Sequence, residues 1–178
     1  MVRKQKYREK QKKRDDLTGE HKVGDAGQLI LACLFSAIWI ADSFFLHYTT
    51  FLNSYVPLIV RTALGLVFLG LSGYLAKKGI SIVFGDKRDK PSVIRKSVFN
   101  FIRHPIYLSE ILLYLVFFMF SMSLATLAML VVAIIFLHYI SRYEERLLIA
   151  RFGEEYIKYM QEVPMWIPRL RKRREKSM

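Results

Sequence analysis

The octapeptide RHPIYLSE, residues 103–110, brings chemically active groups to the point where the chain enters an apolar stretch. Pro105 lacks an N–H group and has a fixed φ, so it suits the first position of a helix, with His104 just before it. The free N–H groups at such a helix start attract an anion, and Arg103 adds positive charge there. Glu110 lies farther along the apolar stretch, where an ionisable group should face protein rather than lipid. A basic anchor reaching the lipid headgroups would explain Arg103, but it would leave the rest of the cluster unexplained.

Four apolar segments must position these residues. The first two, at about residues 26–48 and 57–76, have the roughly 20 residues that a membrane-spanning helix needs. The last two, at 107–122 and 124–140, are shorter and predict one tight helical hairpin whose open end lies near the membrane interface. We therefore expect an all-α integral membrane protein with four transmembrane helices.

The hairpin carries a second polar group toward the first. With its turn near residues 122–123, positions whose numbers sum to about 245 should face each other, which places His104 opposite Ser141. Glu144 and Glu145 then follow within about one turn. The segment SRYE also has the spacing of a capping box, in which Glu144 would only cap a new helix. Both roles for Glu144 are open at this point.

The distribution of Lys and Arg predicts the orientation. Nine of these residues lie in positions 1–25, eight in 77–105 and ten in 141–178, while the connections 49–56 and 121–123 contain none. This is the positive-inside pattern for four spans, with both termini cytoplasmic. Because topology and anionic lipid already explain the net charge of +13, we expect the bilayer rather than a nucleic acid as partner.

The chain divides into three parts in this interpretation. We expect a basic cytoplasmic tail over residues 1–25, a membrane domain over 26–142, and a cytosolic helix with a basic tail over 143–178 that completes the site. Apolar residues at i, i+4 and i+8, beside a basic face, predict an interfacial amphipathic helix at about 91–104. The single cysteine, Cys33, excludes a disulfide or a cysteine metal site within one chain.

Two further charges lie inside the first two spans. Asp42 precedes the end of the first span and Arg61 follows the start of the second, so an antiparallel arrangement places them at similar depth. We expect a structural ion pair between them, with contact to a substrate headgroup as the alternative.

The segments RHPIY and EERLLIARFGEEYIKYMQEVPMWIP resemble the motifs RHPxY, EExxL, FGxxYxxY and VPxxxP of the isoprenylcysteine carboxyl methyltransferase family and its phospholipid N-methyltransferase relatives. The resemblance covers roughly residues 91–170. It implies transfer of a methyl group from S-adenosylmethionine to a lipophilic or membrane-embedded acceptor, either an isoprenylcysteine-like carboxylate or a lipid amine. Two alternatives are an NADPH-dependent membrane sterol or steroid reductase, which carries similar motifs, and a non-enzymatic membrane scaffold.

The resemblance and the chemistry of the cofactor together suggest the site residues. The catalytic candidates are Arg103, Glu110 and Glu145. The acceptor, a lipid or a prenylated small molecule or peptide, is expected to contact Arg142, Trp166 and Arg169. No metal is expected. The residues implied in cofactor binding form an apolar wall and a polar group: Val93, Ile94, Phe99, His104, Pro105, Ile106, Tyr107, Tyr139, Glu144 and Glu145.

Overall fold

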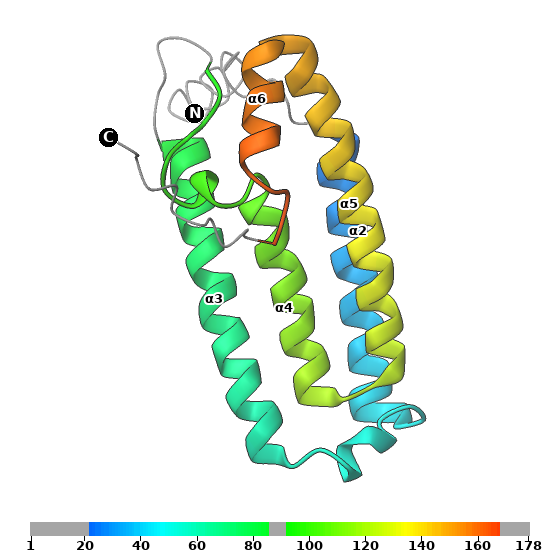
Figure 1. Cartoon of the computed structure of the whole chain (residues 1–178). Helices are drawn as coiled ribbons and strands as arrows, with labels where there is room; N and C mark the ends of the chain where they lie inside the picture. The colour runs from blue at the N-terminus through cyan, green and yellow to red at the C-terminus, as the bar shows by residue number, and fades with distance from the viewer. Residues whose placement is uncertain (1–21, 86–91, 168–178) are drawn as a thin grey trace, which may run out of the picture.

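The computed structural model describes residues 22–85 and 92–167, which form a helical bundle without strands in those ranges (Figure 1). A π-helical segment, Ala41–Leu46, extends the first described helix, and a short 3₁₀ turn, Phe51–Ser54, follows it. The α-helices are α2 Lys22–Ile40, α3 Leu58–Gly85, α4 Pro105–Ser121, α5 Leu124–Phe152 and α6 Glu154–Glu162.

α4 lies between the other long helices, with α3 on one side and α5 and α2 on the other. Small residues let α3 approach it closely, because Gly65, Ser72 and Gly79 are buried at intervals of seven residues. The Ser72 hydroxyl donates to the Ser109 carbonyl over 2.7 Å. A Cβ atom at Gly79 would lie only 2.8 Å from Cγ1 of Ile106, so the contact requires glycine.

Three helical segments are long and apolar enough to cross a membrane: Ala26–Leu46, Leu58–Gly85 and Leu124–Phe152. α4 is equally apolar but has 17 residues, a length of about 26 Å at 1.5 Å per residue. Large apolar side chains on the outer faces of α2 and α3, such as Leu29 and Val67, are exposed. Such faces suit contact with lipid.

α5 continues well past the predicted end of the fourth span. It runs without a break to Phe152, where Gly153 at φ +55° ends it. The predicted cytosolic helix therefore begins as part of α5 and resumes after Gly153 as α6. Because the segment SRYE lies inside α5, the capping-box interpretation of Glu144 is wrong. No helix-breaking residue separates Ile140 from Gly153, so the chain has no reason to start a new helix there.

The amphipathic helix predicted over 91–104 is also wrong where the structure describes it. Residues 92–95 are irregular, and only Ser97–Asn100 forms a short 3₁₀ turn. The backbone of this segment has a long-range partner instead, since the Arg103 N–H donates to the Pro164 carbonyl over 3.0 Å. Its apolar side chains pack onto two different clusters, which a single helical stripe could not reach.

Asp42 does not pair with Arg61. Its carboxylate accepts hydrogen bonds from the hydroxyls of Thr49 and Ser123, each at 2.6 Å. Ser123 is the N-cap of α5 and also accepts from the Thr126 N–H at 3.1 Å. Among the described residues no ion pair joins Asp42 to Arg61, whose Nε is buried without a partner. The predicted pair fails because two hydroxyls satisfy the carboxylate first, that of Ser123 at the turn between α4 and α5 and that of Thr49 in the connection between α2 and α3. This end of the bundle is here called the hairpin end.

Candidate functional site

The opposite end of the bundle, the α6 end, brings the start of α4 against α5. His104 is the N-cap of α4 and Pro105 its first residue. His104 Nε2 lies 3.3 Å from Glu145 Oε1, and its Nδ1 lies 3.7 Å from Glu144 Oε2. His104 thus meets residues about one turn beyond its predicted partner Ser141. The meeting point is twenty residues along α5 from Leu124, about 30 Å, which is the thickness of the hydrocarbon layer.

Glu145 is the buried centre of this cluster, with 2 % of its side chain exposed. Arg103 Nη2 lies 3.2 Å from its Oε1, and Arg142 Nη1 lies 3.4 Å from its Oε2. The Arg103 side chain is buried, whereas that of Arg142 is 55 % exposed. Glu145 therefore connects the members of the cluster, and a guanidinium group beside each of its two oxygens compensates its negative charge.

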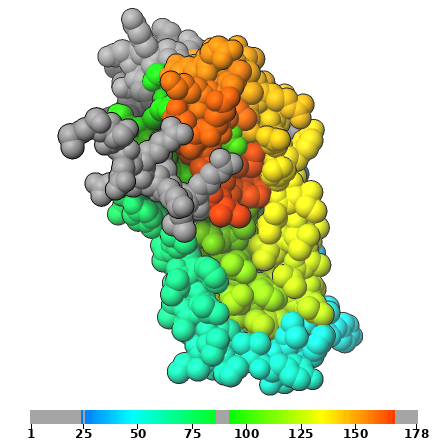
Figure 2. Space-filling view, viewed as in Figure 1, coloured from blue at the N-terminus to red at the C-terminus, as the bar shows by residue number. Residues whose placement is uncertain are grey.

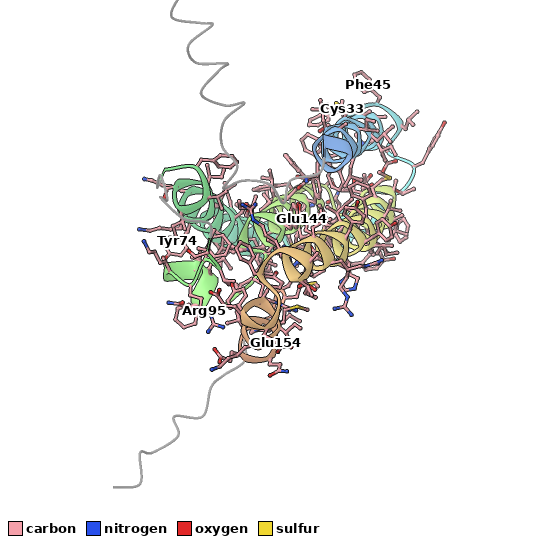
Figure 3. All side chains as sticks on the ribbon, turned by 90° about the horizontal axis from the view of Figure 1, so that it is seen from above. Cys33, Phe45, Tyr74, Arg95, Glu144 and Glu154 are labelled. Carbon is pink, nitrogen blue, oxygen red and sulfur yellow. The ribbon has the colours of Figure 1, made fainter. Side chains whose placement is uncertain are left out.

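Glu144 is the more accessible carboxylate, with 17 % of its side chain exposed. The Tyr107 hydroxyl donates a hydrogen bond to its Oε1, and the Tyr107 ring stacks on His104 at 5.6 Å between centroids. Viewed from the α6 end, Glu144 lies toward the middle of the bundle, whereas Glu154 lies at its rim (Figure 3). The arrangement fixes the orientation of one reachable carboxylate.

His104 is neutral in this setting. Its burial lowers the pKa of the imidazole, and this effect exceeds the opposing effect of its hydrogen bond with Glu145. A neutral imidazole has a single N–H to donate, and Glu145 Oε1 lies within reach of it. His104 then contributes a neutral hydrogen-bonding group that packs beside the two glutamates.

Two side chains near the cluster hold buried hydrogen-bond donors with no acceptor among the described residues. They are Nε and Nη1 of Arg103 and Nε1 of Trp166. Buried donors almost always have a partner in folded proteins, so these nitrogens can donate to an oxygen atom that the described residues do not supply.

A sequence profile of the family described as phospholipid methyltransferase matches residues 60–155, more than half of the chain. The chain belongs to the phospholipid methyltransferase family. This is a family of membrane methyltransferases, and the matched range contains both the start of α4 and the glutamate pair of α5. No curated protein and no solved structure was found to match the chain.

The predicted apolar wall has a different place in this family member. Val93 packs against the buried cluster of α6, while Ile94 and Phe99 pack with residues of α3 and α4. Ile106 points at Gly79 of α3. Pro105 is fully buried beneath the cluster. These packing contacts are with neighbouring helices, and the predicted role of these five residues in cofactor binding stays a prediction.

The remaining predicted residues are spread out. Glu110 lies within α4 and accepts a hydrogen bond from the Tyr114 hydroxyl at 2.6 Å. Tyr139 is 62 % exposed on α5 and is not drawn into the polar cluster. Trp166 packs against the core and meets the ring of His138 edge-on at 5.5 Å. Arg169 lies outside the described residues.

α6 lies on the same face of the molecule as residues 163–167, which follow it and lie against α4 and α5 (Figure 2). The Tyr159 hydroxyl donates to the Phe99 carbonyl over 2.6 Å, and Arg95 pairs with Glu162 at 2.6 Å. Burial raises the pKa of the Tyr159 hydroxyl, so it stays a donor. The sequence did not predict these two contacts between α6 and residues 95–99, although the FGxxYxxY spacing placed Tyr159 on a helix.

Proposed function

We propose that the chain is an S-adenosylmethionine-dependent methyltransferase that modifies a lipophilic acceptor at the membrane interface. The observation that carries the proposal is the meeting of the RHPIY helix start and the EER pair in one cluster, where Glu144 stays accessible. Membership of a membrane methyltransferase family supports the reaction class.

The donor set fits this cofactor. Nε and Nη1 of Arg103 are buried and have no acceptor among the described residues, so they suit an incoming carboxylate. Glu144 suits the ribose hydroxyls, for which a carboxylate is a common acceptor. The Tyr107 hydroxyl holds Glu144 in place. The stacked Tyr107 ring offers an aromatic face to a sulfonium cation.

When bound, the cofactor supplies a methyl group activated by a positively charged sulfur. Transfer is a displacement at carbon, so the chain mainly aligns the acceptor and excludes water. Arg103 and Glu144 fix the position of the donor, and the buried Glu145 fixes Arg103. Residues 163–167 close the side of the site next to α4 and α5.

We favour an amine as the acceptor over a carboxylate. In this proposal the remaining donors of Arg103 bind the carboxylate of the cofactor, and Arg142 is paired with Glu145, which leaves less positive charge to recognise an acceptor carboxylate. An amine must lose a proton, and Glu110 is a carboxylate outside the ion cluster that could receive it. Glu110 lies on the same face of α4 as Tyr107, one turn deeper.

We further propose four spans with both termini in the cytoplasm, which follows from the neutral hairpin end and the basic segments elsewhere. α4 would then be the third of the four spans in chain order, with its short length leaving its start at the interface. Tags at both ends should be protected in sealed right-side-out cells and accessible after permeabilisation. Labelling of either tag in intact cells would contradict the orientation.

The test of the function is calorimetric titration with S-adenosylhomocysteine. Glu144→Gln should weaken binding roughly 10- to 100-fold, because a charged acceptor becomes a neutral amide. Glu154→Gln, an exposed glutamate at the rim, is the matched control and should bind as the wild type does. NADPH should give no binding heat. Equal affinity in Glu144→Gln and wild type would remove Glu144 from the site, and binding of NADPH alone would favour the reductase.

A further inference from the structure

The Arg103 nitrogens that the proposed cofactor would contact are closed off in this structure. Nε and Nη1 of Arg103 are buried and have no acceptor among the described residues, and only 8 % of the side chain is exposed. A ligand oxygen can reach these nitrogens only if a segment beside them moves. One of the surrounding segments must therefore be able to open.

Most of the surroundings are fixed by apolar packing. α4 packs along α3 and against α5, and the 3₁₀ turn before α4 places Val98 and Phe99 in a buried cluster with Leu75 of α3. These segments cannot separate without exposing a buried core, which costs more than a local opening at the surface.

α6 and residues 163–167, here called the lid segment, are attached to the bundle differently. Gly153 joins α5 to α6 at φ +55°, and a Cβ atom at this position would meet open space. A glycine in open surroundings can change its backbone angles without a clash. Gly153 therefore suits a hinge between α5 and the lid segment.

The helical part of the lid segment lies near the Arg103 side chain. Burial raises the pKa of the Tyr156 and Tyr159 hydroxyls of α6, and the positive charge of Arg103 opposes this effect on both of them. Movement of α6 would therefore change what surrounds the Arg103 guanidinium.

The rest of the lid segment is bonded to the start of α4. The Arg103 N–H donates to the Pro164 carbonyl over 3.0 Å, and the His104 N–H donates to the Met165 carbonyl over 3.2 Å. Trp166, near the end of the lid segment, is partly buried against the core, and its indole N–H has no acceptor among the described residues. These contacts can break locally while the helices of the bundle stay packed.

Arg95 connects the last turn of α6 to the segment before α4. Its guanidinium pairs with Glu162 at 2.6 Å and lies 5.1 Å from the centroid of the Tyr159 ring. The side chains of Arg95 and Glu162 are 35 % and 37 % exposed, so water weakens the pair and it can open readily. Viewed along the bundle, Arg95 lies beside α6 (Figure 3).

We propose that the lid segment opens about Gly153 to admit the ligand of Arg103, and that Arg95 sets how often it opens. The proposal rests on the proposed function only for the identity of that ligand, S-adenosylmethionine. Loss of Arg95 destabilises the closed lid segment equally with and without ligand. Ligand entry and release should therefore both become faster, while the equilibrium affinity should stay the same.

Hydrogen–deuterium exchange of the ligand-free full chain in a neutral detergent tests the opening, because the N–H groups of Arg103 and His104 exchange when their bonds to the lid segment break. Arg95→Ala removes both the ion pair and the ring contact and should speed this exchange about fivefold. Glu162→Gln removes the ion pair alone and should speed it about twofold. Lys158→Ala, at an exposed lysine of α6, is the matched control and should leave it unchanged.

The rates of S-adenosylhomocysteine binding are measured on the same proteins by surface plasmon resonance. In Arg95→Ala the association and dissociation rate constants should both rise about fivefold, with a Kd within about twofold of the wild-type value. Lack of binding by the wild type would contradict the proposed function, and the exchange of the Arg103 and His104 amides would still decide whether the lid segment opens.

Three results would overturn the proposal. Wild-type exchange of the Arg103 and His104 amides in Arg95→Ala would show that Arg95 does not hold the lid segment closed. Equally faster exchange in the middle of α4 would mean that the whole fold opens. A Kd that rises in proportion to the dissociation rate constant would mean that Arg95 supports the ligand itself. If Arg95→Ala does not fold, Glu162→Gln decides the question.

Discussion

The two ends of the bundle each place a carboxylate beside a helix start, but they use it differently. At the hairpin end, Asp42 is bound by two hydroxyls, and one of them, that of Ser123, caps α5. At the α6 end, His104 makes no side-chain capping bond at the start of α4, and two nitrogens of the buried Arg103 side chain have no acceptor among the described residues. The hairpin end thus caps its helix with a protein side chain, whereas the start of α4 has no such cap and could receive the anionic group of the proposed ligand.

We propose that this difference separates a structural polar cluster from a functional one. Burial alone does not distinguish them, since Asp42 and Glu145 are 5 % and 2 % exposed. The distinguishing feature is whether a protein side chain caps the helix start beside the carboxylate, because Ser123 caps α5 whereas no side chain caps α4. Variants at the hairpin end should therefore change stability alone, whereas variants at the α6 end should also change ligand binding.

The largest effect is expected from Glu145→Gln. The change removes the negative charge that compensates Arg103 in a buried position, which should cost about 3–5 kcal/mol of unfolding free energy. Unfolding of the purified protein in mixed micelles measures it, with Glu154→Gln as an exposed control. Ligand affinity should fall as well, because Arg103 loses its support. A variant as stable as the wild type would show that the cluster contributes little to the fold.

A smaller and purely structural effect is expected from Asp42→Asn. The two hydroxyls that donate to Asp42 would lose a charged acceptor, a cost of about 2–3 kcal/mol. The same unfolding measurement applies, and titration with S-adenosylhomocysteine should give the wild-type affinity. Weaker binding without a loss of stability would contradict the division of roles between the two ends.

Most of the helical fold could be predicted from local sequence. Apolar length located the helices, and Pro105 marked the start of α4 because its chemistry is local. The segment 91–104 was mispredicted because its partners are distant, including the backbone of Pro164. Amphipathic spacing cannot reveal such pairing.

The site was also predictable only where its residues lie close together in the sequence or across one hairpin. Motif residues that meet across one hairpin, such as His104 and Glu145, could be paired approximately by counting. Asp42 was assigned to Arg61 because sequence shows opposite charges more readily than nearby hydroxyls. The contact of His138 with Trp166 depends on how the chain after α6 folds back, which no local pattern encodes.

The smallest expected effect is a pH dependence carried by His104. Its pKa in the folded protein is lowered by burial from an ordinary value of 6.5, so the unfolded chain takes up a proton at higher pH than the folded one. Stability should therefore be retained above about pH 6.5 and fall as the pH drops below it, by up to about 1.4 kcal/mol per unit. Thermal unfolding between pH 7.5 and 5.5 should show this slope in the wild type and less of it in His104→Gln.

An Asp42→Asn background is the control for the hairpin end, where the carboxylate pairs with neutral hydroxyls. In that background the difference in pH slope between proteins with and without His104→Gln should be the same. A protein that becomes more stable on acidification would instead mean that His104 is a cation paired with Glu145. The α6 end would then contain an ion pair between His104 and Glu145, although burial of the imidazole favours its neutral form.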